Sequence, residues 1–146
     1  MPQFARPSTD TVRDGWENQA AGTVNIFQTI DEVAADDADY IRTGLTPTAD
    51  VYVTKLTTVE DPVSSTGHVV RYRYGKDTAG GDQIDLTVEL RQGYVNEGSP
   101  GVLIATATHS NAGAFPQAGS ITLSGPEADA ITNYADLYLR FVGNKP

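Results

Sequence analysis

The 146-residue chain has the length of one ordinary domain and carries 19 acidic against 10 basic residues, a formal net charge of −9. This acidity disfavours nucleic acid and anionic membranes as partners, since both carry negative phosphate groups. The lack of Cys in the sequence excludes disulfides, thiol catalysis and Cys-ligated zinc. The longest aliphatic run, Val102–Ala105, is far shorter than the ~20 residues of a membrane-spanning helix. We therefore expect no nucleic acid and no membrane among the partners.

The first 25 residues are predicted to form an extended arm, followed by a β-sandwich domain over residues 26–146. Pro2 and Pro7 favour extended backbone in the residues that precede them. Trp16, the only Trp, follows a turn at residues 13–15. A large aromatic side chain so near a terminus either packs the arm onto the domain or faces a ligand, and packing is the commoner role.

Short β-strands are predicted along most of the remaining chain, because apolar and polar residues alternate there. The clearest alternation covers residues 84–90, where the side chains at even numbers are apolar and those at odd numbers are polar. This pattern is typical of an antiparallel sheet that is covered on one side. The other predicted strands are residues 24–30, a short strand from 41, 51–58, 67–74, 102–108, 120–123 and 137–142.

Two segments carry further indications of topology. Residues 102–108 contain little polar interruption, which favours a central strand, and the paired glycines of 75–82 favour a hairpin-like connection. One short helix is predicted over about residues 126–133, because Ser124 and Glu127 form a capping box around Pro126.

The series of about seven or eight short strands without alternating helices predicts an all-β fold. The most favoured architecture is a single jelly-roll-like antiparallel β-sandwich with an extended N-terminal arm and one short late helix. Alternation of side chains does not distinguish this strand order from an immunoglobulin-like one.

Residue patterns typical of catalysis are missing from the sequence. His68 and His109 are far apart, and neither lies in a spacing used by metal-dependent or nucleophilic enzymes. The sequence pairs no two carboxylates in a way that indicates a glycosidase. We therefore expect no catalytic residues and no enzyme activity.

An acidic segment at residues 31–40 is the one candidate metal site, because Ca²⁺ prefers carboxylate and carbonyl oxygens. Its best placed ligands are Asp36, Asp37 and Asp39. The spacing does not match an EF-hand, and a solvated loop is the alternative interpretation. Apart from this Ca²⁺ candidate we expect no cofactor.

Tyr72 and Tyr74 share one face of the predicted strand 67–74, with Arg71 and Arg73 on the other. The Tyr-bearing face either forms half of the core or exposes an aromatic platform on which a sugar ring could stack. A core position is the favoured interpretation.

Three segments together resemble a widespread set of small β-sandwich structural proteins of tailed bacteriophages and prophages. They are the run Arg6-Pro7-Ser8-x-Asp10 with Gly15-Trp16, the acidic segment up to Ile41, and residues 130–141 (AITNYADLYLRF). The chain departs from these proteins at Tyr134, where they often have Trp.

The resemblance implies a virion structural role, most simply that of a capsid decoration (cement) protein on the outer surface of the head. The implied partner is the major capsid protein, the implied assembly is a homotrimer, and the implied location is the capsid exterior after assembly in the host cytoplasm. The expected contacts involve Phe4, Arg6 and Trp16 of the arm and the loops 76–82 and 94–100. A carbohydrate-binding β-sandwich module of a phage tail or fibre is the alternative.

Overall fold

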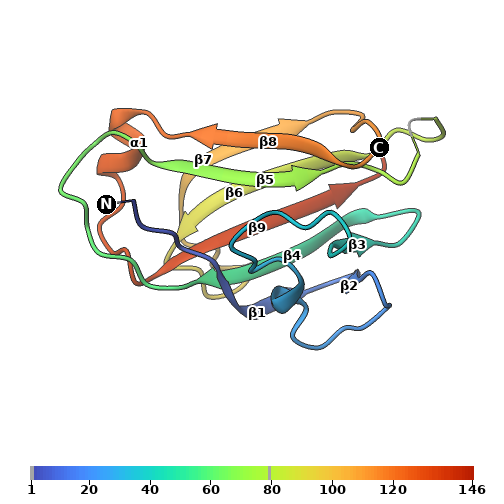
Figure 1. Cartoon of the computed structure of the whole chain (residues 1–146), viewed down its shortest axis with the longest axis horizontal. Coiled ribbons are helices and arrows are strands. Elements are labelled where there is room, and N and C mark those ends of the chain that lie inside the picture. Colours follow the sequence, from blue (N-terminus) through green and yellow to red (C-terminus); the bar gives the residue numbers. More distant parts are fainter. Residues whose placement is uncertain (1, 79) are drawn as a thin grey trace.

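The computed structural model describes residues 2–78 and 80–146 (Figure 1). Its elements are strands, one 3₁₀ turn (η1, Ile26–Thr29) and one short helix (α1, Gly125–Asp129). The strands are β1 (Pro7–Arg13), β2 (Trp16–Asn18), β3 (Ile41–Thr43), β4 (Thr48–Leu56), β5 (Val69–Tyr74), β6 (Asp85–Gln92), β7 (Val102–His109), β8 (Gln117–Thr122) and β9 (Leu137–Asn144). The prediction of an all-β antiparallel sandwich is confirmed.

One layer is a five-stranded sheet in the order β1-β4-β9-β6-β7. Its pairs are antiparallel, and β9 lies in the centre between β4 and β6. The alternation predicted for residues 84–90 is present in β6, where Val88 and Leu90 are buried in the main hydrophobic cluster. The side chains at even positions of β6 therefore define the inner face of this sheet.

The second layer consists of two separate two-stranded sheets, β5–β8 and β2–β3. In Figure 1, β5 and β8 run together along the top of the molecule, β2 and β3 lie toward the lower right, and β9 is visible between them. Each small sheet covers a different part of the inner face of the large one. The second layer is therefore interrupted above the centre of the five-stranded sheet.

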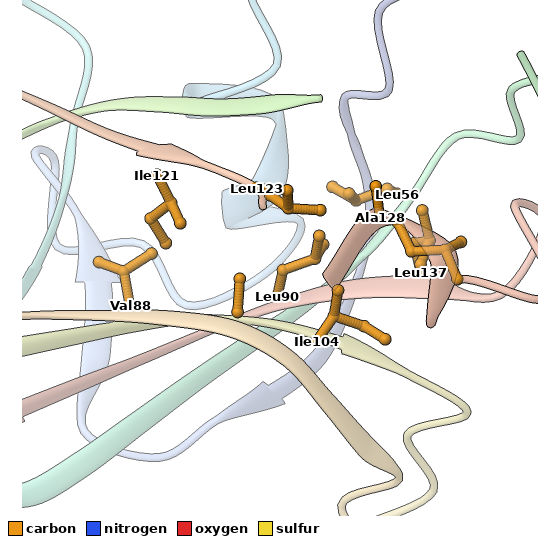
Figure 2. Packing of buried hydrophobic residues seen from close by; sticks show 10 residues of the cluster. Leu56, Val88, Leu90, Ile104, Ile121, Leu123, Ala128 and Leu137 are labelled. Carbon is orange, nitrogen blue, oxygen red and sulfur yellow. The ribbon is translucent and has the colours of Figure 1, made fainter. Parts of the chain in front are cut away.

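The main core lies under β8 and α1. Figure 2 shows Ile121 and Leu123 facing Val88, Leu90 and Ile104 of the five-stranded sheet. Leu56, Ala128 and Leu137 extend the same cluster toward the helix.

A smaller core lies under β2 and β3. Trp16 is 8% exposed and packs against Tyr52 and Phe141, with ring centroids 6.2 and 6.4 Å away, respectively. Its indole Nε1 donates a hydrogen bond of 3.0 Å to the Asp50 carbonyl oxygen. The expected packing role of Trp16 is confirmed, and the ring has little surface left for a partner.

The N-terminal residues differ from the expected arm. Residues 7–13 form β1, an edge strand of the large sheet, and residues 16–18 form β2. The predicted strand 24–30 is wrong, because Asn25 has a left-handed backbone (φ 52°) and residues 26–29 form η1. The Asp10 carboxylate accepts the backbone N–H groups of Ile26 and Phe27 at 2.9 Å each and thereby stabilises this turn.

Two topological expectations are also wrong. Residues 102–108 form β7, an edge strand rather than a central one. The 75–82 segment does not connect a hairpin, because β5 pairs with β8 and β6 pairs with β7 and β9. Alternation reports which face of a strand is buried, whereas neighbours in the sheet depend on distant parts of the chain.

The predicted helix is present but shorter, as α1. The Ser124 hydroxyl accepts the Glu127 N–H, and the Glu127 carboxylate accepts the Ser124 N–H at 2.7 Å, which completes the capping box.

Candidate functional site: a groove between the sheets

The interruption in the second layer forms a groove of about 1620 Å³, which we call the inter-sheet groove. Its floor is the inner face of the large sheet around Leu139 and Phe141, one wall is β5, and the opposite wall is β3 with the acidic segment 31–40. This volume exceeds the roughly 300–1,000 Å³ typical of small-molecule sites. The groove is large enough for a segment of polypeptide.

The floor of the groove is apolar although it lies at the centre of the sheet. Leu139 and Phe141 belong to the central strand β9, but they are only partly buried. The inward positions of the flanking strands are buried more completely, with Tyr52 and Val88 at 0% exposure. The least covered part of the inner face is therefore its middle, where burial is ordinarily greatest.

The β5 wall presents a free strand edge. Among residues 2–78 and 80–146, β5 pairs only with β8, and its other edge borders the groove. The Leu123 N–H donates to the His68 carbonyl at 3.0 Å, so 68 and 123 form a hydrogen-bonded pair in the ladder. Because such pairs alternate along an antiparallel ladder, the backbone groups of Val69, Arg71 and Arg73 point away from β8 and toward the groove.

The side chains of β5 alternate as the sequence predicted. Arg71 and Arg73 are exposed, whereas Tyr72 and Tyr74 face inward and are partly buried. The Tyr72 hydroxyl lies 2.8 Å from His109 Nε2, and the ring of Tyr74 stacks on His109 with centroids 3.9 Å apart. Burial lowers the pKa of His109. These tyrosines therefore form part of the interior rather than an exposed platform for a sugar.

The acidic segment forms the opposite rim and contacts β5 at one end of the groove. Asp37 pairs with Arg73 at 3.6 Å, and the rings of Tyr40 and Phe115 lie 5.7 Å apart. These two contacts narrow the groove beside the C-terminal end of β5.

The three carboxylates considered as Ca²⁺ ligands bind different partners. Asp36 accepts the N–H of Ala38, Asp37 pairs with Arg73, and Asp39 accepts Gln19 Nε2 at 2.6 Å. Within residues 2–78 and 80–146, no group of three or more His, Asp or Glu side chains is placed to hold a metal ion.

Glu32 lines the groove wall and is partly exposed, but one of its two carboxylate oxygens is buried. Its Oε1 atom is buried and has no hydrogen-bond partner among the described residues. Burial raises the pKa of Glu32, and the nearby Asp39, Asp31 and Asp36 raise it further. A buried carboxylate oxygen without a donor is costly, so this wall favours a ligand that brings an N–H or ammonium group.

The N-terminal residues 2–7 also line the groove. Arg6 Nη1 donates to the Glu32 carbonyl oxygen, and the Arg6 guanidinium lies 5.3 Å from the centre of the Phe4 ring. Phe4 is 62% exposed. Of the three residues expected to make contacts, Phe4 and Arg6 border the groove at its surface, whereas the Trp16 ring lines it from the core.

On the opposite face of the sheet, the structure reveals an ion network that the sequence did not suggest. Glu89 accepts Arg91 Nε at 2.6 Å and Arg140 Nη1 at 3.1 Å, and Arg140 also forms two bonds with Glu97. Tyr94 donates to Glu97 at 2.7 Å, so the network holds the expected contact loop 94–100 against the sheet. The alternation in residues 84–91 places Glu89 and Arg91 on the polar face of β6, but it does not indicate that Arg140 and Glu97 join them.

Comparisons of the chain with protein-family models, with curated proteins and with solved structures give no match. Among the described residues, no helix is long and apolar enough to cross a membrane.

Proposed function

We propose that the chain is a virion structural protein, specifically a capsid decoration protein that binds the outer surface of a phage head. The observation that carries a binding role is the rim of the inter-sheet groove. Phe4, Val33 and Leu45 border it and are 62%, 87% and 86% exposed. Large apolar side chains gathered around an apolar groove are typical of a protein-binding surface.

The capsid assignment rests on the resemblance of three segments of the sequence to phage structural proteins, together with the charge. A net charge of −9 suits the outside of a shell better than its DNA-facing inside. The partner in this proposal is the major capsid protein.

A second apolar surface supports self-association. Val102 and Leu103 of the edge strand β7 are 56% and 44% exposed, and Val95 of the neighbouring loop is 68% exposed. This surface is separate from the groove rim, so it is available for contacts between copies of the chain while the rim binds the capsid protein. We assign it to the homotrimer, which light scattering of the purified protein tests directly. A monomer at micromolar concentration would contradict this part of the proposal.

The decoration role is tested by quantitative mass spectrometry of purified particles from the source. The measured quantity is the number of copies of this chain per major capsid subunit. A ratio near one, or a simple fraction of one, is expected. A handful of copies per particle would contradict decoration and indicate a tail or neck position, and complete absence would overturn the virion role.

A further inference from the structure

We infer that the inter-sheet groove binds an extended polypeptide segment of a partner protein, which adds a strand to the free edge of β5 and covers Leu139 and Phe141. This inference deepens the proposed function, because it names how the chain would hold its partner. The occupant is an extended segment with alternating apolar side chains and one Lys or Arg.

The backbone of β5 is the first argument for a peptide. The outward-pointing N–H and C=O groups of Val69, Arg71 and Arg73 have no hydrogen-bond partner among the described residues. An extended peptide supplies matching donors and acceptors at the same repeat, which a sugar does not. β5 has six residues, so the complementary segment is about six residues long.

The opposite wall offers a second free edge. Gln19 N–H donates to the Tyr40 carbonyl at 3.0 Å in continuation of the β2–β3 ladder. By the same alternation, the backbone groups of Ile41 and Thr43 point away from β2. β3 lines the groove, so the two small sheets border it with strands that have free edges. A strand added there would join the interrupted layer.

The floor determines the side chains of the occupant. In an added strand, alternate residues face the large sheet, where Leu139, Phe141 and Leu86 are only partly buried. Apolar residues at these positions would be removed from water together with the floor. The buried Glu32 Oε1 lacks a donor, which favours one Lys or Arg on the occupant.

The experiment selects ten-residue peptides from a random library with the purified full chain and measures their binding by calorimetry. We expect the selected peptides to alternate apolar and polar residues, to contain Lys or Arg, and to bind with a micromolar Kd. N-methylation at alternate backbone nitrogens should weaken binding at least tenfold in one register and little in the other. Failure to select any peptide, or equal effects in both registers, would overturn the inference.

Two variants of the chain provide a matched pair. Arg71→Pro removes an N–H group that points into the groove, and Thr122→Pro removes an N–H group on the far edge of β8, at a position that does not line the groove. Both substitutions spare the hydrogen bonds between β5 and β8. R71P should reduce affinity at least tenfold, whereas T122P should leave it unchanged. Equal affinities in two folded variants would contradict strand addition.

Hydrogen exchange of the unmodified chain gives an answer that does not depend on a variant folding. The amides of Arg71 and Arg73 should exchange quickly in the free chain and slow at least tenfold with a selected peptide bound, while those of Tyr72 and Tyr74 are protected in both states. Unchanged exchange at Arg71 and Arg73 would place the peptide elsewhere.

Glu32→Gln should weaken the binding of a Lys-containing peptide at least fivefold, and it should weaken the binding of the Lys→norleucine analogue less than twofold. Equal effects on the two peptides would contradict the pairing with Glu32. Peptide binding by a chain that is absent from particles would overturn the capsid role and leave this inference standing. If the chain is abundant on particles but binds no peptide, this inference is overturned and the capsid role stands.

Discussion

Leu90 and Leu139 lie directly opposite each other in the β6–β9 ladder, yet only Leu90 is fully buried, at 5% exposure. Leu139 belongs to the central strand but borders the inter-sheet groove and is partly buried. Both side chains line the groove, but Leu90 also packs in the buried cluster beneath Ile121 and Leu123, so the coverage of the sheet changes between two facing side chains of the same type.

This difference predicts unequal costs for the same truncation. Leu90→Ala should lower the free energy of unfolding by about 3–4 kcal/mol, since it leaves a cavity in a packed core. Leu139→Ala should lower the free energy of unfolding by only about 1–2 kcal/mol, because the Leu139 side chain is partly exposed to water in the folded chain. Urea denaturation of both variants measures the difference, and equal costs would show that the groove is closed in solution.

Asp10 holds η1 to the large sheet. Its carboxylate accepts the N–H groups of Ile26 and Phe27 and the Tyr52 hydroxyl, the last at 2.8 Å, and its side chain is 8% exposed. Burial and the bond to Asp10 raise the pKa of Tyr52. Asp10→Ala should cost about 2–4 kcal/mol, because three buried donors lose their acceptor. The exposed Asp14→Ala should change stability by less than about 0.5 kcal/mol in the same denaturation measurement.

The ion network on the outer face predicts an acid-dependent loss of stability. Hydrogen bonds from Arg140 lower the pKa of Glu97 below its ordinary 4.5. As the pH falls, the Glu97 carboxylate is therefore protonated in the unfolded chain before it is protonated in the folded chain. The stabilisation that this carboxylate contributes is full above about pH 4.5 and is lost as the pH falls through the lowered pKa of the folded state.

Glu97→Gln should remove this contribution, about 0.5–1 kcal/mol, since Glu97 is 41% exposed and partly screened by solvent. The measurement compares unfolding free energies between pH 3 and 6. The stability of the variant should depend less steeply on pH than that of the parent chain. Glu60→Gln is the control, because the Glu60 side chain forms no hydrogen bond among the described residues. Parallel curves for E97Q and the parent would exclude the contribution of Glu97.

Gly143 is required where β2–β3 packs on β9. A Cβ atom there would lie 2.9 Å from Thr43 Cγ2 and 3.5 Å from Trp16 Cζ2. Gly143→Ala should cost about 1–2 kcal/mol and shift the Trp16 emission to longer wavelength, because the small sheet must move outward. Gly44→Ala is the matched control, with no atom within 4 Å of its added Cβ. Unchanged emission in G143A would show that the contact adjusts without displacement.

The all-β class, the strands with strict alternation and the capping box of α1 could be predicted from the sequence, because these features depend on residues close together in the chain. It also indicated the inward face of β5 with Tyr72 and Tyr74. Its error at residues 24–30 arose because Asp10, sixteen residues away from Ile26, fixes a turn there through hydrogen bonds.

The pairing of the strands and the position of the groove between the sheets could not be predicted from the sequence, because both depend on contacts between distant segments. β5 pairs with β8 across more than forty residues of sequence, and the gap beside it depends on where β2 and β3 come to rest on Phe141 and Gly143. The groove is bounded by segments that are distant in the sequence, and the alternation of side chains within one strand does not indicate the distance between the edges of β5 and β3.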